Sequence, residues 1–257
     1  MATKSSPARP RALIAPLTQT DRPVAGDTSK KTEEKPDHVG HRSRLRDKFL
    51  TSGPGALHDY ELLELLLFLA NPRRDMKPMA KALLKKFGTF ADVISADANE
   101  LREVDGVGNG VVTALKTAQA SALALLQGDV MEKPVLSNWQ QLMDYCRAAQ
   151  AFDKTERFRV LYLNQKNALI ADEVQQKGTV NHTPVYPREV VKRALEIGAT
   201  AIIMVHNHPS GDPTPSNADI EMTREVQEAC QSLGIVLHDH IIVTRGETTS
   251  FKTEGLL

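Results

Sequence analysis

Apolar residues follow two different rhythms along this chain, and the rhythm changes near residue 130. From His41 to about Gln127 they recur three or four positions apart, most clearly over 61–70 and 77–87, which predicts helices separated by turns. Beyond residue 134, short apolar or alternating runs separate helix-like stretches. They predict strands at 157–164, 168–174, 201–205 and 235–243, and helices at 139–149, 187–197 and from 216 to about 233.

The ends of two predicted helices carry typical terminal residues. Pro187 fits the first turn of one helix and Gly198 closes it, while Ser216 suits the N-cap of another helix that ends before Gly234. Strands that alternate with helices favour a mixed sheet with helices on its faces. We therefore expect an α/β (α+β) domain over residues 134–257, joined by a short linker at 128–134 to a small all-α domain over 39–127.

Residues 1–38 differ in composition from the rest of the chain. They are rich in Pro, Ser, Thr and Lys, carry no acidic residue before position 21, and contain only a short apolar patch at 12–15. Such a segment buries too little apolar surface to fold, so we expect a disordered N-terminal arm. A transit peptide over about the first 20 residues stays open as an alternative.

The overall composition is typical of a soluble protein of the cytoplasm. In 257 residues, 32 Lys and Arg balance 32 Asp and Glu, so no global field favours nucleic acid or a membrane surface. No apolar run approaches the length of a membrane span. Cys146 and Cys230 lie far apart and outside any paired metal motif, which predicts reduced, buried thiols.

The strongest chemical signal directly follows the apolar run at 201–205. His206 and His208 leave the carboxyl end of this predicted strand, and both imidazoles face the same way because side chains alternate along a strand. Asp219 lies in the first turn of the helix that Ser216 caps. Two imidazoles and a carboxylate are ligands that zinc takes in catalytic sites, where the fourth position is left for water. The pattern predicts one zinc ion on His206, His208 and Asp219.

Other interpretations compete for these residues. Ser216-x-x-Asp219 is also a capping box, which needs no metal. A metal can also serve structure or regulation in a domain that binds a partner without cleaving it. The letters His-Asn-His do not indicate an HNH nuclease, whose residues are dispersed over a ββα unit. No Pro-Cys-x-x-Cys supplies the ligands of a cytidine deaminase.

The spacing of the motif, His-x-His, seven residues, Ser, two residues and Asp, resembles the JAMM motif of JAB/MPN-type metallohydrolases. The run at 206–216 is similar to the bacterial RadC branch of that group. The resemblance covers about residue 37 to the C-terminus, through 41–46, 61–67, 186–191 and 238–242. It implies a JAB/MPN-like mixed sheet, a helix-hairpin-helix-like N-terminal domain, and zinc-dependent cleavage of a peptide or isopeptide bond in a peptide or protein substrate.

The resemblance also implies roles for two further residues. In JAMM enzymes a glutamate on an upstream strand takes a proton from water and delivers it to the leaving amine, and the matching position is Glu173. Ser216 matches the serine whose hydroxyl stabilises the oxyanion. Asp172 and Glu173 point to opposite faces of a strand, so only one of them can face the metal. Glu189 is the rival base, although its position at a helix start explains it without catalysis.

A glycine-containing turn at 104–108 lies within the helical domain. Gly106 and Gly108 resemble the hairpin of a helix-hairpin-helix motif, in which backbone amides approach a DNA phosphate. Over 39–127, however, 12 Lys and Arg stand against 10 Asp and Glu, a weak basic excess for DNA binding. The alternative function is a DNA-binding repair or recombination factor in which the metal domain docks or processes a partner. The alternative for the glycines is a turn between packed helices.

Four further residues carry predictions of their own. His238 and His240 form a second His-x-His in the predicted strand at 235–243, and we expect them to face the same way. We expect hydrogen bonding or support of the first site from this pair rather than a second metal. His182 lies in a predicted loop, and Trp139 is predicted to anchor the core.

Overall fold

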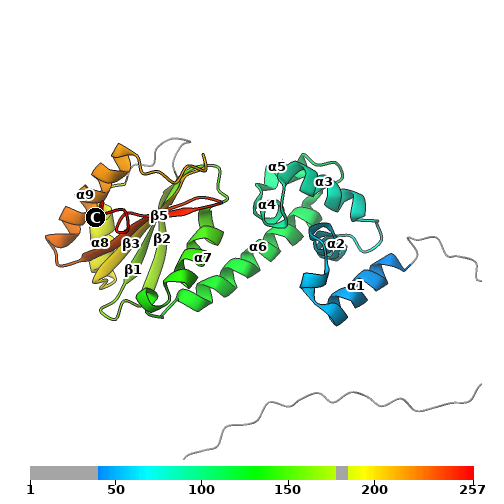
Figure 1. Cartoon of the computed structure of the whole chain (residues 1–257), viewed down its shortest axis with the longest axis horizontal. Helices are drawn as coiled ribbons and strands as arrows, with labels where there is room; N and C mark the ends of the chain where they lie inside the picture. Colours follow the sequence, from blue (N-terminus) through cyan, green and yellow to red (C-terminus); the bar gives the residue numbers. More distant parts are fainter. Residues whose placement is uncertain (1–39, 178–184) are drawn as a thin grey trace, which may run out of the picture. The chain divides into compact units, whose positions relative to one another are not determined.

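The computed structural model describes residues 40–177 and 185–257, so the predicted N-terminal arm and His182 lie outside the described residues. The first part is helical: α1 (His41–Ser52), α2 (Asp59–Ala70), α3 (Lys77–Phe87), α4 (Phe90–Ser95), α5 (Ala98–Arg102) and α6 (Asn109–Val130), with a 3-10 turn at Pro54–Ala56 (Figure 1). The second part mixes strands and helices after a 3-10 turn at Val135–Ser137: α7 (Trp139–Gln150), β1 (Arg157–Leu163), β2 (Leu169–Lys177), α8 (Pro187–Glu196), β3 (Ala201–Asn207), α9 (Asn217–Gln231), β4 (Val236–Val243) and β5 (Thr248–Ser250).

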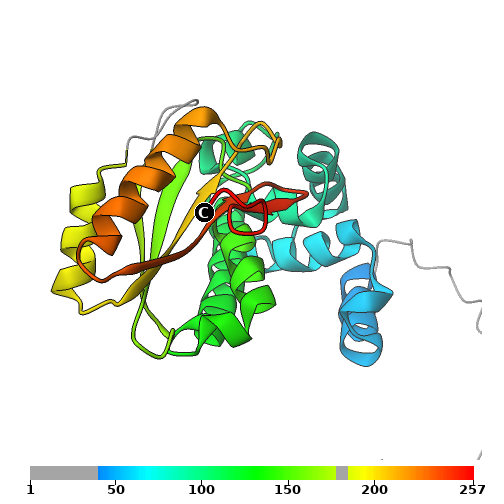
Figure 2. The same ribbon diagram turned by 60° about the vertical axis from the view of Figure 1, so that its left-hand side comes forward.

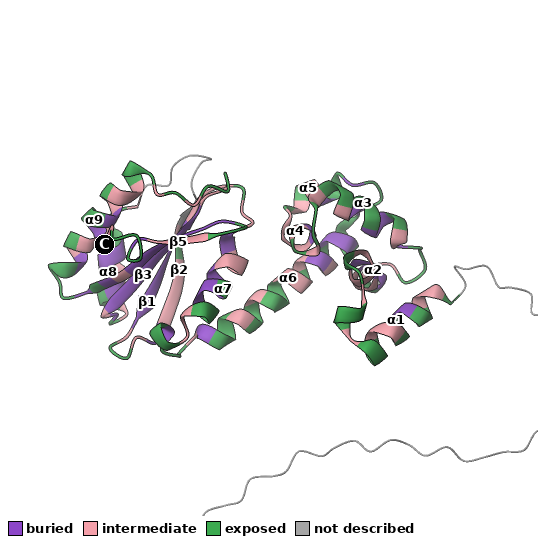
Figure 3. Cartoon of the chain, in the orientation of Figure 1, coloured by how far each residue is buried: buried purple, intermediate pink, exposed green. Residues whose placement is uncertain are grey.

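The strands form one mixed sheet in the order β2-β1-β3-β4-β5. β3 pairs parallel with β4, and the other neighbours are antiparallel. A parallel pair needs a crossover connection, which α9 supplies between β3 and β4. β3 lies at the centre of the sheet and all seven of its residues are buried, as the purple ribbon in Figure 3 shows. The predicted mixed sheet with helices on its faces is confirmed.

Two separate apolar cores cover the two faces of the sheet. Figures 1 and 2 show α8 (yellow) and α9 (orange) together on one face, and α7 (green) on the other. On the α8/α9 face, Ile202 and Met204 of β3 pack with residues of both helices. On the α7 face, Ile203 and Val205 pack with Leu142 and other α7 residues. Because side chains alternate, His206 follows Ile202 and Met204 onto the α8/α9 face.

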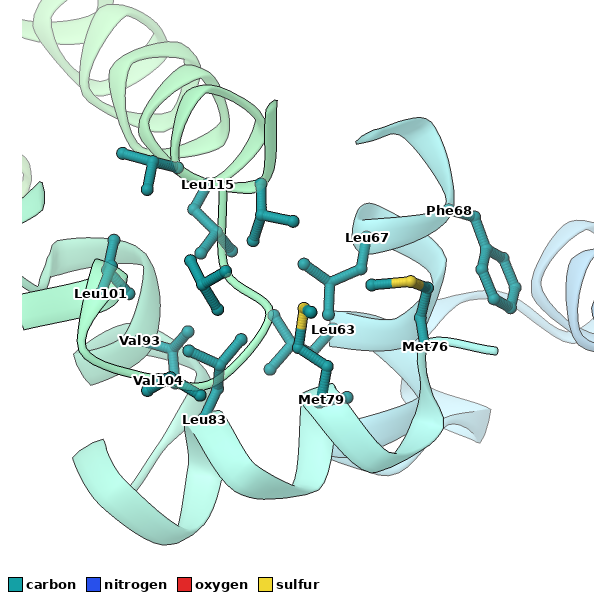
Figure 4. Packing of buried hydrophobic residues seen from close by; sticks show 14 of the residues in the cluster. Leu63, Leu67, Phe68, Met76, Met79, Leu83, Val93, Leu101, Val104 and Leu115 are labelled. Atoms are coloured by element: carbon teal, nitrogen blue, oxygen red, sulfur yellow. The ribbon is translucent and has the colours of Figure 1, made fainter. Parts of the chain in front are cut away.

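The helical part has its own apolar core. Leu63 and Leu67, four residues apart on α2, face Met76 and Met79 at the start of α3 (Figure 4). Leu115 of α6 is also fully buried in this cluster. Within residues 40–177 and 185–257, none of the helices combines the length and the apolar character that crossing a bilayer requires.

The segment predicted as a linker at 128–134 is partly helical, so that prediction was wrong at its start. Helix α6 continues through Gly128 to Val130. Val130 is 1% exposed and belongs to the core on the α7 face of the sheet. Burial of this one side chain at the end of α6 favours continuing the helix, although glycine alone costs about 1 kcal/mol in a helix interior. Trp139 is partly buried against the same core, as predicted.

Candidate metal centre

The three predicted metal ligands come together where β3 ends and α9 begins. His206 is the sixth residue of β3, paired with Phe158 of β1 and Ile242 of β4, and its side chain is almost fully buried. His208 follows the strand in the turn that leads to α9, and Asp219 lies in the first turn of α9. The ligand atoms of these three residues all lie within 4.8 Å of one another. Within the described part of the chain, no other group of three or more such side chains converges in this way.

The distances within the cluster suit a small cation. Nε2 of His206 lies 3.4 Å from Oδ1 of Asp219, and Nε2 of His208 lies 3.6 Å from Oδ2. The two Nε2 atoms are 2.9 Å apart. Ligand atoms about 2.0 Å from a tetrahedral zinc are roughly 3.3 Å from one another, so the carboxylate distances match and the imidazole pair is somewhat closer.

A tight turn aims His208 at the cluster. Gly211 adopts φ 86°, a left-handed conformation that glycine adopts without strain, and its amide donates to the carbonyl of His208. Nδ1 of His208 donates to the backbone carbonyl of Asp212 at 2.7 Å. A neutral His208 ring therefore presents an unprotonated Nε2 toward His206. Two lone pairs at this distance repel unless a proton or a cation lies between them, so the donor set fits a metal ion.

The charges in the cluster are arranged to favour a cation. Burial lowers the pKa of His206 to about 4, which keeps its imidazole neutral near pH 7. The nearby carboxylate of Asp219 raises the pKa of His208 above its ordinary value, although partial burial opposes the shift. Burial would raise the pKa of Asp219, yet the adjacent histidines and two hydrogen bonds from Ser216 hold it well below its usual range. The carboxylate is therefore ionised and available as a ligand.

Ser216 is tied to the same carboxylate. Its side chain accepts from the amide of Asp219 at 3.2 Å, and its hydroxyl donates to Oδ2 of Asp219 at 2.6 Å. The backbone amide of Ser216 also donates to Oδ2, at 2.8 Å. The capping box is therefore present. It does not compete with the metal interpretation, because Oδ1 and the remaining lone pairs of Asp219 still face the two histidines.

Glu173 lies on the same face of the sheet as the cluster but is not part of it. In β2 it pairs with Val160, whereas His206 pairs with Phe158, two residues earlier in β1. Its carboxylate accepts from Nη2 and Nε of Arg193 on α8, at 2.6 and 2.9 Å. Arg193 was not anticipated from the sequence. The role of Glu173 as a base remains a prediction.

The neighbour Asp172 and the rival base Glu189 both have other partners. Asp172 faces the opposite side of the sheet, as predicted, where it bonds the hydroxyl of Tyr145 and Nη1 of Arg159 in a largely buried ion pair. Glu189 lies in the first turn of α8, half-exposed, and pairs with its neighbour Arg188. Both positions are explained by charge pairing or by the helix dipole.

The prediction that His238 and His240 face the same way was wrong. A register shift opposite Ile202 and Ile203 interrupts β4 between Leu237 and Asp239, so the alternation of side chains breaks at His238. Nε2 of His238 bonds Oδ1 of Asn167 at 2.7 Å. Nε2 of His240 instead bonds Nδ1 of His206 at 2.8 Å. His240 thus supports a candidate ligand, which was one of the roles expected.

In the helical part, the glycine turn connects α5 to α6. Gly106 adopts φ 76°, and a Cβ added there would lie 2.8 Å from Nη1 of Arg74. Gly108 is the N-cap of α6, with an ordinary φ of −99° and open space around its Cβ position. The guanidinium of Arg102 reaches the first residue of α6, donating to Oδ1 of Asn109 at 3.3 Å. The geometry allows a helix-hairpin-helix turn.

The mixed sheet, its helices and the histidine-aspartate cluster define an α/β domain of JAB type. It follows the helical N-terminal part of the chain. Residues 136–256 match the RadC-like JAB domain, and residues 37–113 match the UPF0758 N-terminal domain. A UPF0758 protein of Rhodobacter capsulatus is 58% identical over 213 residues, which are 83% of this chain and 100% of the relative. A UPF0758 protein of Ruegeria pomeroyi is 55% identical over 217 residues, covering 84% of this chain and 97% of the relative. The chain belongs to the RadC-like UPF0758 family.

Proposed function

We propose that this protein is a zinc-dependent amide hydrolase that cleaves a peptide or isopeptide bond in the cytoplasm. The observation that carries the proposal is the convergence of Nε2 of His206, Nε2 of His208 and the carboxylate of Asp219 at one end of the central strand. Zinc takes this ligand set, and when bound it polarises a carbonyl and acidifies water. The RadC-like JAB match supports the same reaction class.

The chain's own residues supply the remaining steps of the proposed reaction. Glu173 accepts a proton from the attacking water and passes it to the leaving amine, which needs a carboxylate on the same face of the sheet as the cluster. Its partner Arg193 is 40% exposed at the side chain, so the pair is open to rearrangement when substrate binds. Ser216 is exposed at the start of α9, and its hydroxyl turns its one proton from Asp219 to the developing oxyanion. The direct test is hydrolysis of a mixed peptide and isopeptide library by the zinc-loaded full chain and by the Glu173→Gln variant.

We expect Ser216→Ala to lower kcat by about 10- to 10³-fold, because the oxyanion loses a hydroxyl donor. Loss of the cap should also destabilise the chain by about 1 kcal/mol. Hydrolysis assays combined with thermal melting separate the two effects, and Ser216→Thr, which keeps a hydroxyl and a cap, is the matched control. A lower melting temperature with unchanged kcat would limit Ser216 to the capping box.

DNA binding is the second candidate function, and one observation favours it. In the described structure no side chain caps the start of α6 at Gly108, and no acidic residue lies in its first turn. Free amides at a helix N-terminus attract phosphate, and Arg102 adds a positive charge beside them. We propose that, if the chain binds DNA, this turn makes the contact without reading sequence.

Gly108→Leu should remove such binding from the full chain, because a bulky side chain blocks the close approach of the backbone to phosphate. The ordinary φ and open surroundings of Gly108 let the variant fold, whereas a side chain at Gly106 would meet Arg74. Binding to a duplex of arbitrary sequence is measured across salt concentrations, since phosphate contacts weaken steeply as salt rises. If the wild-type chain shows no salt-sensitive binding to DNA at low ionic strength, the turn only connects two helices. The DNA proposal is then wrong.

A further inference from the structure

Behind the candidate metal centre, a hydrogen-bonded chain joins α9, β4 and β3. The hydroxyl of Thr223 lies 2.5 Å from the backbone carbonyl of Asp219, one turn earlier in α9. The same oxygen lies 2.6 Å from Nδ1 of His240. Nε2 of His240 then lies 2.8 Å from Nδ1 of His206. Thr223 is 1% exposed, His240 0% and His206 4%, so water does not compete for these bonds.

The direction of every proton in this chain follows from its first member. A backbone carbonyl can only accept, so the single hydroxyl proton of Thr223 goes to Asp219. The Thr223 oxygen must then accept from His240, which places a proton on Nδ1 of His240. A neutral His240 consequently has an unprotonated Nε2, which accepts from Nδ1–H of His206. The neutral His206 ring is left with its lone pair on Nε2, the atom that faces His208 and Asp219.

We propose that Thr223 and His240 are positioning residues that set the tautomer and ring orientation of His206, so that Nε2 of His206 is held ready to bind a metal ion. The inference rests on the candidate metal centre and deepens it. Outer hydrogen bonds of this kind fix ligand histidines in metal sites and typically change metal affinity by about 10- to 100-fold.

The surroundings of His240 support the neutral form that this chain requires. Its ring packs against Phe251, with centroids 4.4 Å apart, and against the edge of Phe158 at 5.7 Å. A charged imidazole is costly among apolar rings. A protonated His240 would donate from Nε2 and leave Nδ1 of His206 as the acceptor, which would move the proton of His206 to the metal-facing nitrogen. Burial in the apolar core thus helps to maintain the tautomer.

A purely structural role of the Thr223 hydroxyl is the alternative, and the test must distinguish it from the proposed positioning role. Threonine in a helix often bonds the carbonyl four residues earlier, with no functional consequence. Thr223 does more than this, because its hydroxyl oxygen also accepts a hydrogen bond from His240. This second bond links α9 to β4. Replacing the hydroxyl by a methyl group of similar size removes both bonds while keeping the shape of the side chain.

The experiment compares Thr223→Val with Thr223→Ser in the full chain. Metal-free protein is labelled with 15N at histidine, the ring signals of His206 are assigned against a His206→Ala variant, and ring nitrogen shifts report the tautomer. Wild type and Thr223→Ser should show His206 protonated at Nδ1, and Thr223→Val should show a mixture. Zinc affinity, measured by competition with a chromophoric chelator, should fall about 10- to 100-fold in Thr223→Val and stay within about threefold in Thr223→Ser.

A second pair of variants, at His240, keeps the inference testable if Thr223→Val folds poorly. His240→Gln retains a carbonyl oxygen able to accept from His206 and should bind zinc more tightly than His240→Leu, which has no acceptor. Equal zinc affinity for Thr223→Val and Thr223→Ser with an unchanged His206 tautomer, or equal affinity for the two His240 variants, would overturn the inference. A wild-type chain that binds zinc but cleaves no peptide would end the hydrolase proposal and leave this inference standing.

Discussion

Purified, tag-free protein should contain about one zinc ion per chain, and the double variant His206→Ala/His208→Ala should contain none. The two imidazoles supply two of the three ligand atoms that converge at the end of β3. The carboxylate of Asp219 alone, already bonded by Ser216, gives too few donors to retain the ion. Elemental analysis of dialysed protein measures the metal directly, without knowledge of any substrate.

His238→Ala is the matched control for this measurement. It removes a histidine from the same sheet whose ring bonds Asn167 rather than the cluster, so zinc content should stay near one per chain. Circular dichroism of both variants must match the wild type, because His206 is buried and its truncation disturbs packing. If a folded double variant still contained about one zinc per chain, the metal would bind elsewhere and the assignment of His206 and His208 as ligands would be wrong.

The candidate ligands could be found from the sequence because their geometry is local. Strand alternation directs His206, the turn after β3 aims His208, and the capping geometry of Ser216 fixes where Asp219 lies at the start of α9. The nine-residue segment 208–216 joins these two elements. The structure therefore needs little long-range information to bring the three side chains together.

The hydrogen bonds that link His206 to His240 and Thr223 could not be predicted from the sequence in the same way. Thr223 falls at a position of the helix pattern that is otherwise apolar, and only its contact with His240 gives the hydroxyl a partner. His240 reaches His206 because β3 and β4 pair in parallel with a bulge beside His238. Strand register between segments separated by a helix is set by packing and is not encoded in local spacing. A threonine in an apolar stripe and a histidine in a buried strand were the available signals.

The same limit applies to charged pairs that join different elements. Glu173 pairs with Arg193 across α8 and β2, and Asp172 pairs with Arg159 between neighbouring strands. The alternation of β2 correctly predicted that the two acidic residues face opposite sides of the sheet. It carried no information on which arginine each would meet, because that choice depends on strand register for Arg159 and on the packing of α8 for Arg193.

Glu173→Gln is expected to keep zinc at about one ion per chain and to lower the rate of peptide or isopeptide hydrolysis by about 10² or more. Glutamine has nearly the same shape and can still accept a bond from Arg193, so the fold and the face of the sheet stay as they are. It cannot take a proton from water near neutral pH, which removes the proposed transfer to the leaving amine. The measurement is kcat on a cleaved member of the peptide library, with metal content determined on the same sample.

Glu189→Gln separates the two candidate bases. Glu189 is half-exposed, pairs with Arg188 and lies in the first turn of α8, where a negative charge is favoured by the helix dipole alone. Its replacement should therefore leave kcat within about twofold and cost a few tenths of a kcal/mol in stability. Full activity in Glu173→Gln together with loss of activity in Glu189→Gln would transfer the proton shuttle to α8. Full activity in both variants, with zinc bound, would require a base outside these two carboxylates.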